Sequence, residues 1–186
     1  SAVSGRQAVT NAIIEDGAFS PSLIIAVGKA AVGMTQGALD KWPDCAALVV
    51  TKYGHVTADF DPFPRVNVLE AAHPVPDENS LVAGNLLIDT IEALLADSKV
   101  LFLVSGGASA LAEALPSDIS LDALKSMTDE MLATGKTIGQ INTRRKAFSL
   151  IKDGKLTGRF PGEQIRVYAI SDVEGDFNPL SSMAVK

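Results

Sequence analysis

Short apolar runs separated by helical segments constrain the fold of this chain more than any other feature of its sequence. The apolar runs are residues 23–27, 48–51 and 100–104, and two further strand candidates, residues 66–70 and 165–170, are mostly apolar. Runs this short are typical of strands that helices cover on both faces. Their alternation with helical segments predicts a single α/β domain over residues 1–186, a Rossmann-like three-layer sandwich with a mostly parallel sheet.

Capping residues locate several of the predicted helices. Asp77 and Glu78 supply a cap and negative charge at the start of one helix. Ser120 is suited to cap a later helix, and Gly135 to end it, because glycine readily adopts the left-handed conformation found after many helices. The basic stretch that follows predicts a further helical segment over residues 137–153.

The segments that follow the predicted strands are polar or rich in glycine. In a parallel sheet the carboxyl ends of the strands share one edge, and ligands of such folds bind beyond it. The segments are Gly28-Lys29, Lys52 to His55, His73-Pro74, Ser105 to Ser109, and Ser171-Asp172. We therefore expect the ligand site along this edge.

One of these segments has the composition of a phosphate-binding loop: Ser105, Gly106, Gly107, Ala108 and Ser109. Glycines let backbone N–H groups converge on an anion, a helix start adds partial positive charge, and serine hydroxyls add donors. We predict that these five residues bind phosphate or nucleotide. The alternative is a tight strand–helix turn that needs small residues for packing alone.

Lys29 follows Gly28, at which the first apolar run ends, and we place it in the first turn of the next helix. Helix starts favour acidic residues, so a lysine here is unusual. It would offer a point charge to a phosphate group. The alternative is a solvated surface lysine.

The two histidines, His55 and His73, are not spaced as zinc ligands. His73 lies in a proline-rich loop, where it either contacts a ligand or forms a hydrogen bond with the loop backbone. Asp172 and Asp176 follow the last apolar run, and either could hold Mg²⁺ through its carboxylate oxygens.

The segment Asn142-Thr143-Arg144-Arg145-Lys146 places three cations in a row. On a helix such cations point in different directions, so one or two could reach an acidic substrate. The alternative is a solvated helix face.

Composition excludes several classes of partner. The 16 basic and 22 acidic residues give a net charge of −6 without a basic block, which argues against a nucleic-acid interface. No run approaches the ~20 apolar residues of a membrane span. Cys45 is the single cysteine and permits no internal disulfide, which fits a reducing compartment. We expect a cytoplasmic protein with a small-molecule ligand.

Six segments occur in an order that resembles the N-terminal domain of the glycerate 2-kinase family, whose C-terminal half is the MOFRL domain. They are residues 28–31, 51–55, 70–78, 103–111, 141–146 and 171–176. Some members of this family have been called hydroxypyruvate reductases. The resemblance extends from about Leu23 to Asp176. The chain departs from the family pattern at Ala108, where a glycine is usual, and over residues 178–186.

The resemblance implies phosphoryl transfer from ATP to the 2-hydroxyl of D-glycerate, with Mg²⁺. It implies that Lys29 is catalytic and that the loop Ser105 to Ser109 binds phosphate. The other expected site residues are Lys52, His73, Asn142 and Arg145 for the substrate and Asp172 for the metal. The active site of the family lies between two domains, and the MOFRL half is absent from this sequence. We expect the isolated chain to be inactive, and a missing domain or a second copy to complete the site.

Two other functions stay open. The chain could be a non-catalytic lobe that binds an anionic metabolite or nucleotide. It could also belong to an NAD(P)H-dependent hydroxypyruvate reductase, but no G-x-G-x-x-G motif follows any predicted strand.

Overall fold

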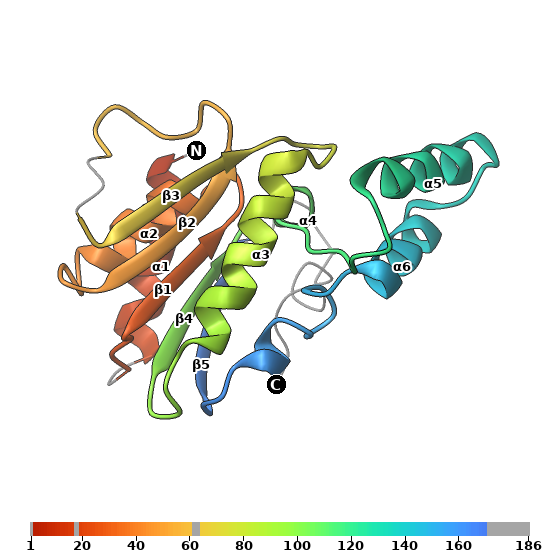
Figure 1. Cartoon of the computed structure of the whole chain (residues 1–186). Helices are drawn as coiled ribbons and strands as arrows, with labels where there is room; N and C mark the ends of the chain where they lie inside the picture. The colour runs from red at the N-terminus through yellow and green to blue at the C-terminus, as the bar shows by residue number, and fades with distance from the viewer. Residues whose placement is uncertain (1, 17–18, 61–63, 171–186) are drawn as a thin grey trace.

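Five parallel strands form one sheet in the computed structural model, which describes residues 2–16, 19–60 and 64–170. The strands are β1 (Leu23–Val27), β2 (Ala46–Lys52), β3 (Val66–Ala71), β4 (Lys99–Val104) and β5 (Gln164–Ala169). Their order is β3-β2-β1-β4-β5, and every neighbouring pair is parallel (Figure 1). The α/β prediction is confirmed, and the described sheet is parallel throughout.

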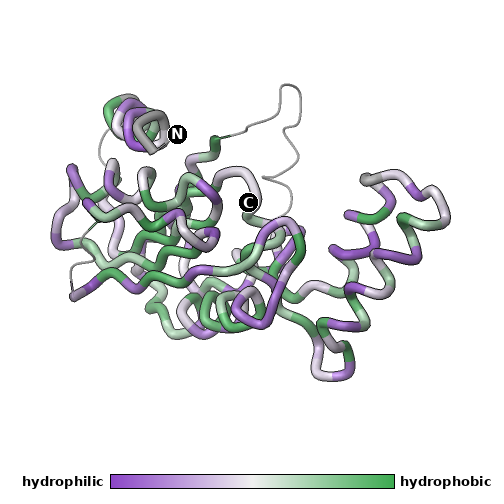
Figure 2. The backbone as a smooth tube through the Cα atoms, turned by 90° about the horizontal axis from the view of Figure 1, so that it is seen from above, coloured by the Kyte–Doolittle hydropathy of each residue, from purple (hydrophilic) through white to green (hydrophobic). Residues whose placement is uncertain are grey.

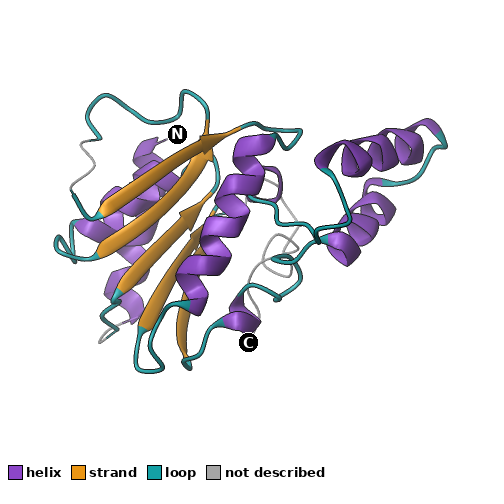
Figure 3. Ribbon diagram, in the orientation of Figure 1, coloured by secondary structure: helices purple, strands orange, loops and turns teal. Residues whose placement is uncertain are grey.

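Helices cover both faces of the sheet (Figure 3). Helices α1 (Ala2–Asp16) and α2 (Ala31–Leu39) lie on one face, and α3 (Glu78–Glu92) lies on the other. Along β1, Ile24 and Ala26 pack on the α1–α2 side, whereas Leu23, Ile25 and Val27 pack on the α3 side. Both sets are buried, so the strand shows no polar alternation.

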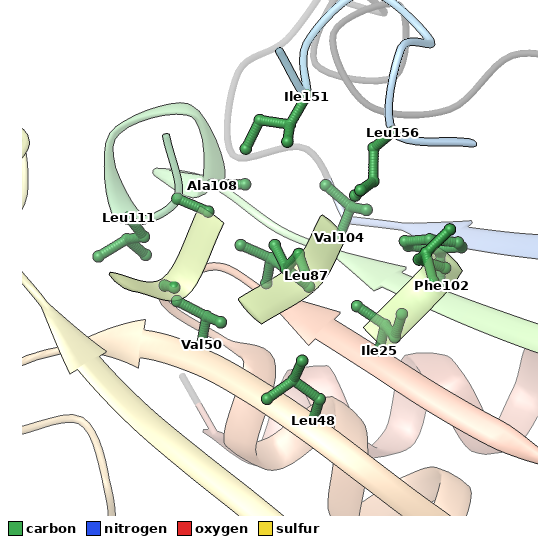
Figure 4. Close-up of a cluster of buried hydrophobic side chains, with 14 of the residues drawn as sticks. Ile25, Leu48, Val50, Leu87, Phe102, Val104, Ala108, Leu111, Ile151 and Leu156 are labelled. Atoms are coloured by element: carbon green, nitrogen blue, oxygen red, sulfur yellow. The ribbon is translucent and has the colours of Figure 1, made fainter. Parts of the chain in front are cut away.

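The α3 side holds the larger of the two cores. In Figure 4, Leu87 of α3 lies among Ile25, Phe102 and Val104 of the sheet. Ile151 belongs to the same cluster, although it comes from a segment much later in the chain. The core on this side therefore joins the sheet, α3 and that later segment.

The predicted caps are present. The Asp77 side chain caps α3 by accepting a hydrogen bond from the Ser80 N–H at 3.0 Å, and Ser120 caps α5 (Leu121–Ala133) in the same way through Ala123. Gly135 has a φ of +72° just beyond α5, as its predicted role requires.

Helices α5 and α6 (Ile138–Phe148) pack mainly on each other and project beyond the sheet (Figures 1 and 2). We refer to residues 115–148 as the helical arm. The short helix α4 (Ala108–Leu111) precedes the arm, and the 3-10 turn η1 (Thr157–Arg159) follows it. Within the described residues, no helix has the length and apolar character needed to cross a bilayer.

The predicted helix over 137–153 ends earlier than expected. Helix α6 stops at Phe148, and Ser149 is extended with a ψ of 139°. The Ser149 hydroxyl accepts hydrogen bonds from the N–H groups of Ile151 and Lys152, and Asp153 adopts a left-handed φ of 61°. Serine therefore offers these amides an alternative to the helix. The last strand also begins and ends one residue before the predicted range 165–170.

Candidate functional site

The site forms where the chain direction reverses across the sheet. Strands β1 and β4 are neighbours, and Val27 pairs with Val104 at their carboxyl ends. From β1 the chain continues toward β2, whereas from β4 it continues toward β5. Ligands of doubly wound folds bind in the crevice beyond such a reversal. The segments that leave β1 and β4 here begin at Gly28 and Ser105.

These two segments are bonded to each other. The Lys29 N–H donates to the Gly106 carbonyl at 2.9 Å, and the Ala30 N–H donates to the Ser105 hydroxyl at 3.0 Å. Gly28 has a φ of +139°, and any side chain here would overlap Ser105. The Ser105 hydroxyl, predicted to contact phosphate, is thus buried and engaged with backbone.

Lys29 precedes α2 instead of lying in its first turn. The helix starts at Ala31, with Ala30 at the N-cap position. The prediction of its position was wrong because the left-handed turn at Gly28 delays the helix. The Lys29 backbone therefore belongs to the loop that faces Gly106.

Gly107 brings three distant segments together. It has a φ of +88°, and a Cβ atom at this position would lie 2.8 Å from His73 Cδ2 and 3.4 Å from Lys29 Cγ. The backbone of the glycine-rich loop, the His73 imidazole and the Lys29 side chain are thus in close proximity. The absence of a side chain at Gly107 is what allows the His73 ring to lie against the backbone of this loop.

Partial burial and the neighbouring side chains lower the pKa of His73. Burial is the largest cause, and electrostatic interactions with Lys29, Lys52 and His55 add to it. His55 also bonds through Nδ1 to the Lys29 carbonyl at 3.0 Å. The lowered pKa favours the neutral form of the His73 imidazole.

Asp77 holds the loop that carries His73. Its carboxylate accepts hydrogen bonds from the Ala72 N–H at 3.3 Å and from the Tyr53 hydroxyl at 2.7 Å, besides capping α3. Burial alone would raise the pKa of Asp77, but these hydrogen bonds lower it. The start of α3 thus fixes the residues on both sides of the His73 loop.

Helix α6 brings Arg145 to the glycine-rich loop. Its Nη2 donates to the Ser109 carbonyl at 3.3 Å. Asn142 lies nearly one turn earlier on the same helix and is exposed. The Arg144 guanidinium instead lies 4.7 Å from the centre of the Phe148 ring. Of these two arginines, Arg145 is the one bonded to the loop.

A metal site is not evident in the part of the chain that the structure describes. These residues contain no group of three or more His, Cys, Asp or Glu side chains that could hold an ion. The predicted ligand Asp172, together with Asp176, lies outside the described residues. The described side chains are thus suited to an anion but do not form a magnesium site.

Sequence reasoning missed the groups that hold the site loops. Tyr53 and Asp77 form one such contact, and Gly28 forms another with Ser105. A glycine directly after a buried strand was a usable signal for the second contact. For the Tyr53 contact no local signal exists, because the partners come from different loops.

Comparison with known proteins places the chain among its relatives. The family described as "Domain of unknown function (DUF4147)" matches residues 1–184. The chain is 36% identical over 156 residues to D-glycerate 2-kinase of Thermotoga maritima, covering 83% of this chain and 37% of that protein. The name hydroxypyruvate reductase also occurs, for a protein of Agrobacterium vitis that is 36% identical over 83% of this chain and 35% of its own length.

A solved structure agrees with the fold. The crystal structure of glycerate kinase from Thermotoga maritima superimposes with a TM-score of 0.85 at 32% identity. The match covers 97% of this chain and 44% of that chain. The chain thus spans less than half the length of the relatives it matches.

Proposed function

This chain belongs to the DUF4147 family, the N-terminal domain of glycerate 2-kinases, and from that premise we propose that the complete protein transfers a phosphoryl group from ATP to the 2-hydroxyl of D-glycerate. One observation carries the proposal most directly. Lys29, His73 and the bare backbone of Gly107 lie together at the reversal point of the sheet. Phosphoryl transfer depends on positioning and on positive charge, which is what this arrangement offers.

In the proposed reaction the glycerate 2-hydroxyl oxygen forms a bond to the γ-phosphorus of ATP. The bond from that phosphorus to the β–γ bridging oxygen breaks, and ADP leaves with its electron pair. Lys29 stabilises the negative charge on the transferred group. We propose that backbone N–H groups of the Ser105–Ser109 loop bind the phosphates.

The remaining predicted residues have roles that fit glycerate. The lowered pKa of His73 favours its neutral form, which can accept a hydrogen bond from the 2-hydroxyl and take its proton as the bond to phosphorus forms. Lys52 and Arg145 are suited to pair with the carboxylate, and Asn142 offers an amide to the same ligand. We assign no step to Mg²⁺, since the described residues do not form its site.

We further propose that other residues complete the active site, either from the remainder of the protein or from a second copy. The chain covers 37% of its Thermotoga relative, so much of that protein has no counterpart here. Catalysis is therefore a property we propose for the complete protein, and anion binding is the property we propose for this chain.

The test uses the complete protein with ATP, Mg²⁺ and D-glycerate, and follows ADP release together with phosphoglycerate by phosphorus NMR. Lys29→Met should lower kcat by about 10²–10³-fold, the usual effect of removing one charge-stabilising donor. Lys41→Met, an exposed lysine beyond α2, is the matched control and should leave kcat unchanged. Equal turnover in the two variants would overturn the role of Lys29.

The same samples distinguish the other candidate functions. Nucleotide binding without turnover of glycerate would favour a non-catalytic lobe. Hydroxypyruvate-dependent oxidation of NADH or NADPH would favour a reductase, although the sequence lacks the dinucleotide-binding motif.

A further inference from the structure

A buried ion pair lies at the base of the helical arm. Glu113 precedes the arm and Lys152 follows it, and their side chains are bonded directly, Lys152 Nζ to Glu113 Oε2. Both residues are almost fully buried, at 0% and 1% exposure. The proposed reaction uses neither of them.

The pair joins the two ends of the arm to each other. Beside it, the Leu150 N–H donates to the Ala114 carbonyl at 2.8 Å. Lys152 is also fixed through its own N–H, which donates to the Ser149 hydroxyl at 3.2 Å. Its neighbour Ile151 is fully buried in the core on the α3 side. The end of the arm is therefore anchored to the body of the domain.

The pair also connects to the helix that holds the His73 loop. The Glu113 N–H donates to the Ser80 carbonyl at 3.0 Å, and Ser80 is part of the capping box at the start of α3. Gly84 on α3 packs so closely against the Glu113 carbonyl that no side chain fits at that position. Both contacts fix the Glu113 backbone against α3, the helix whose first turn holds the His73 loop.

Arg145 is the site residue that depends on this base. It lies less than one helical turn before the end of α6. Burial lowers the pKa of Lys152 to about 8, Glu113 opposes that shift, and the positive charge of Arg145 adds to the lowering as the smallest of these causes. Its guanidinium reaches the Ser109 carbonyl. Because α5 and α6 pack mainly on each other, the base of the arm sets where Arg145 lies.

Stability alone does not account for this arrangement. Apolar residues of similar volume often serve as well as a buried ion pair or better, since desolvation offsets the attraction between the charges. What a buried ion pair can add is conformational specificity, because any arrangement that separates the partners leaves an uncompensated charge in the interior.

We infer that Glu113 and Lys152 are positioning residues whose ion pair fixes the helical arm, so that Arg145 stays against the Ser105–Ser109 loop. The expected effect of the ion pair on glycerate binding rests on the proposed function. Its expected effect on the position of the helical arm does not.

The first test measures the position of the arm without any ligand. Spin labels are placed at Ala133→Cys on α5 and Asp89→Cys on α3, in a Cys45→Ala background, and their distance distribution is recorded by pulsed electron paramagnetic resonance. The apolar pair Glu113→Leu/Lys152→Met should broaden the distribution at least twofold. The matched control replaces the exposed pair Arg159–Glu92 by Arg159→Met/Glu92→Gln and should leave it narrow. An unchanged width in the apolar pair would overturn the inference.

The second test measures glycerate kinetics in the complete protein. The apolar pair should raise KM for D-glycerate about tenfold and change kcat less than twofold. Arg145→Met should raise KM to a similar extent, and adding the apolar pair to Arg145→Met should raise it less than twofold further. If the two increases in KM multiply in the combined variant, the inference is overturned, since the ion pair would then act independently of Arg145.

Failure of the proposed function is distinguishable from failure of the inference. If the complete protein does not phosphorylate glycerate, the proposed function fails, and the spin-label distances decide the inference alone. If the apolar pair does not fold, Glu113→Gln replaces it in both tests, because the amide keeps the volume of Glu113 and removes the charge.

Discussion

Substitution of Gly107 by alanine tests whether the glycine-rich loop, His73 and Lys29 form one site. Gly107 has a φ of +88°, and its new Cβ would lie 2.8 Å from His73 Cδ2 and 3.1 Å from His73 Nε2. Separations this short between carbon atoms are strongly repulsive, so the imidazole must move. A side chain can rotate where backbone cannot, and we therefore expect the protein to fold with a displaced ring.

The matched control is Gly135→Ala. Gly135 has a similar φ of +72°, but nothing lies within 4 Å of a Cβ built there. A non-glycine residue in the left-handed region costs roughly 1–2 kcal/mol, and this term is common to both variants. Moving the His73 ring away from its preferred rotamer adds about 1 kcal/mol at Gly107 alone.

Urea unfolding measures how much free energy of unfolding each variant loses, and NMR of the histidine side chains detects whether the His73 ring has moved. We expect Gly107→Ala to be destabilised by about 1 kcal/mol more than Gly135→Ala. The imidazole signals of His73 should shift in the first variant and stay in place in the second. Equal losses together with unshifted His73 signals would refute the proximity of this glycine and histidine.

Four further predictions concern charges and caps. Lys29→Met should raise the pKa of His73 toward its ordinary value of 6.5 in an NMR titration, because the Lys29 charge contributes to lowering it. The folded chain binds the His73 proton more weakly than the unfolded chain does. The contribution of His73 to the free energy of unfolding is therefore complete above pH 6.5 and is lost as the pH falls through the lower folded pKa. His73→Asn should reduce this loss of stability when urea unfolding is measured at successive pH values. Glu113→Leu alone should cost about 3–5 kcal/mol in urea unfolding because it leaves Lys152 buried without its partner, whereas adding Lys152→Met should recover most of that loss. Asp77→Ala should lower the free energy of unfolding by about 1–2 kcal/mol through loss of the α3 cap, and a smaller effect than that of Ser120→Ala would contradict its additional role in holding the His73 loop.

The sequence predicted the sheet and its helix caps because those signals are local. The central strands β1, β2 and β4 are buried on both faces, so each contains an apolar run that local sequence reveals. The edge strands β3 and β5 are only partly buried and include polar residues such as Asn67 and Arg166. Asp77 and Ser120 cap helices through bonds that span three residues. The end of α6 was missed because it depends on a serine hydroxyl competing for backbone amides, which helical periodicity does not reveal.

The candidate site was predictable as an edge of the sheet but not as a set of contacts. Parallel strands bring their carboxyl ends together, so Lys29, His73 and Gly107 could be assigned to one edge from sequence. That Ser105 turns inward to bond Ala30 could not, because its direction depends on how closely the β1 and β4 loops approach. The loops approach that closely because Gly28 has no side chain.

The ion pair at the base of the arm did leave a signal in the sequence, although one that no helical or strand pattern captures. Glu113 is the sole charge in the run Ala110 to Leu115, and Lys152 directly follows the apolar pair Leu150-Ile151. A charge enclosed by apolar neighbours is carried into the interior with them, and burial without a partner of opposite sign is too costly to persist. Glu113 is therefore expected to have a buried cationic partner, and Lys152, which has apolar neighbours on its N-terminal side, is a candidate for it. Their separation by 39 positions also implies that the intervening segment leaves the core and returns to it, as the helical arm does.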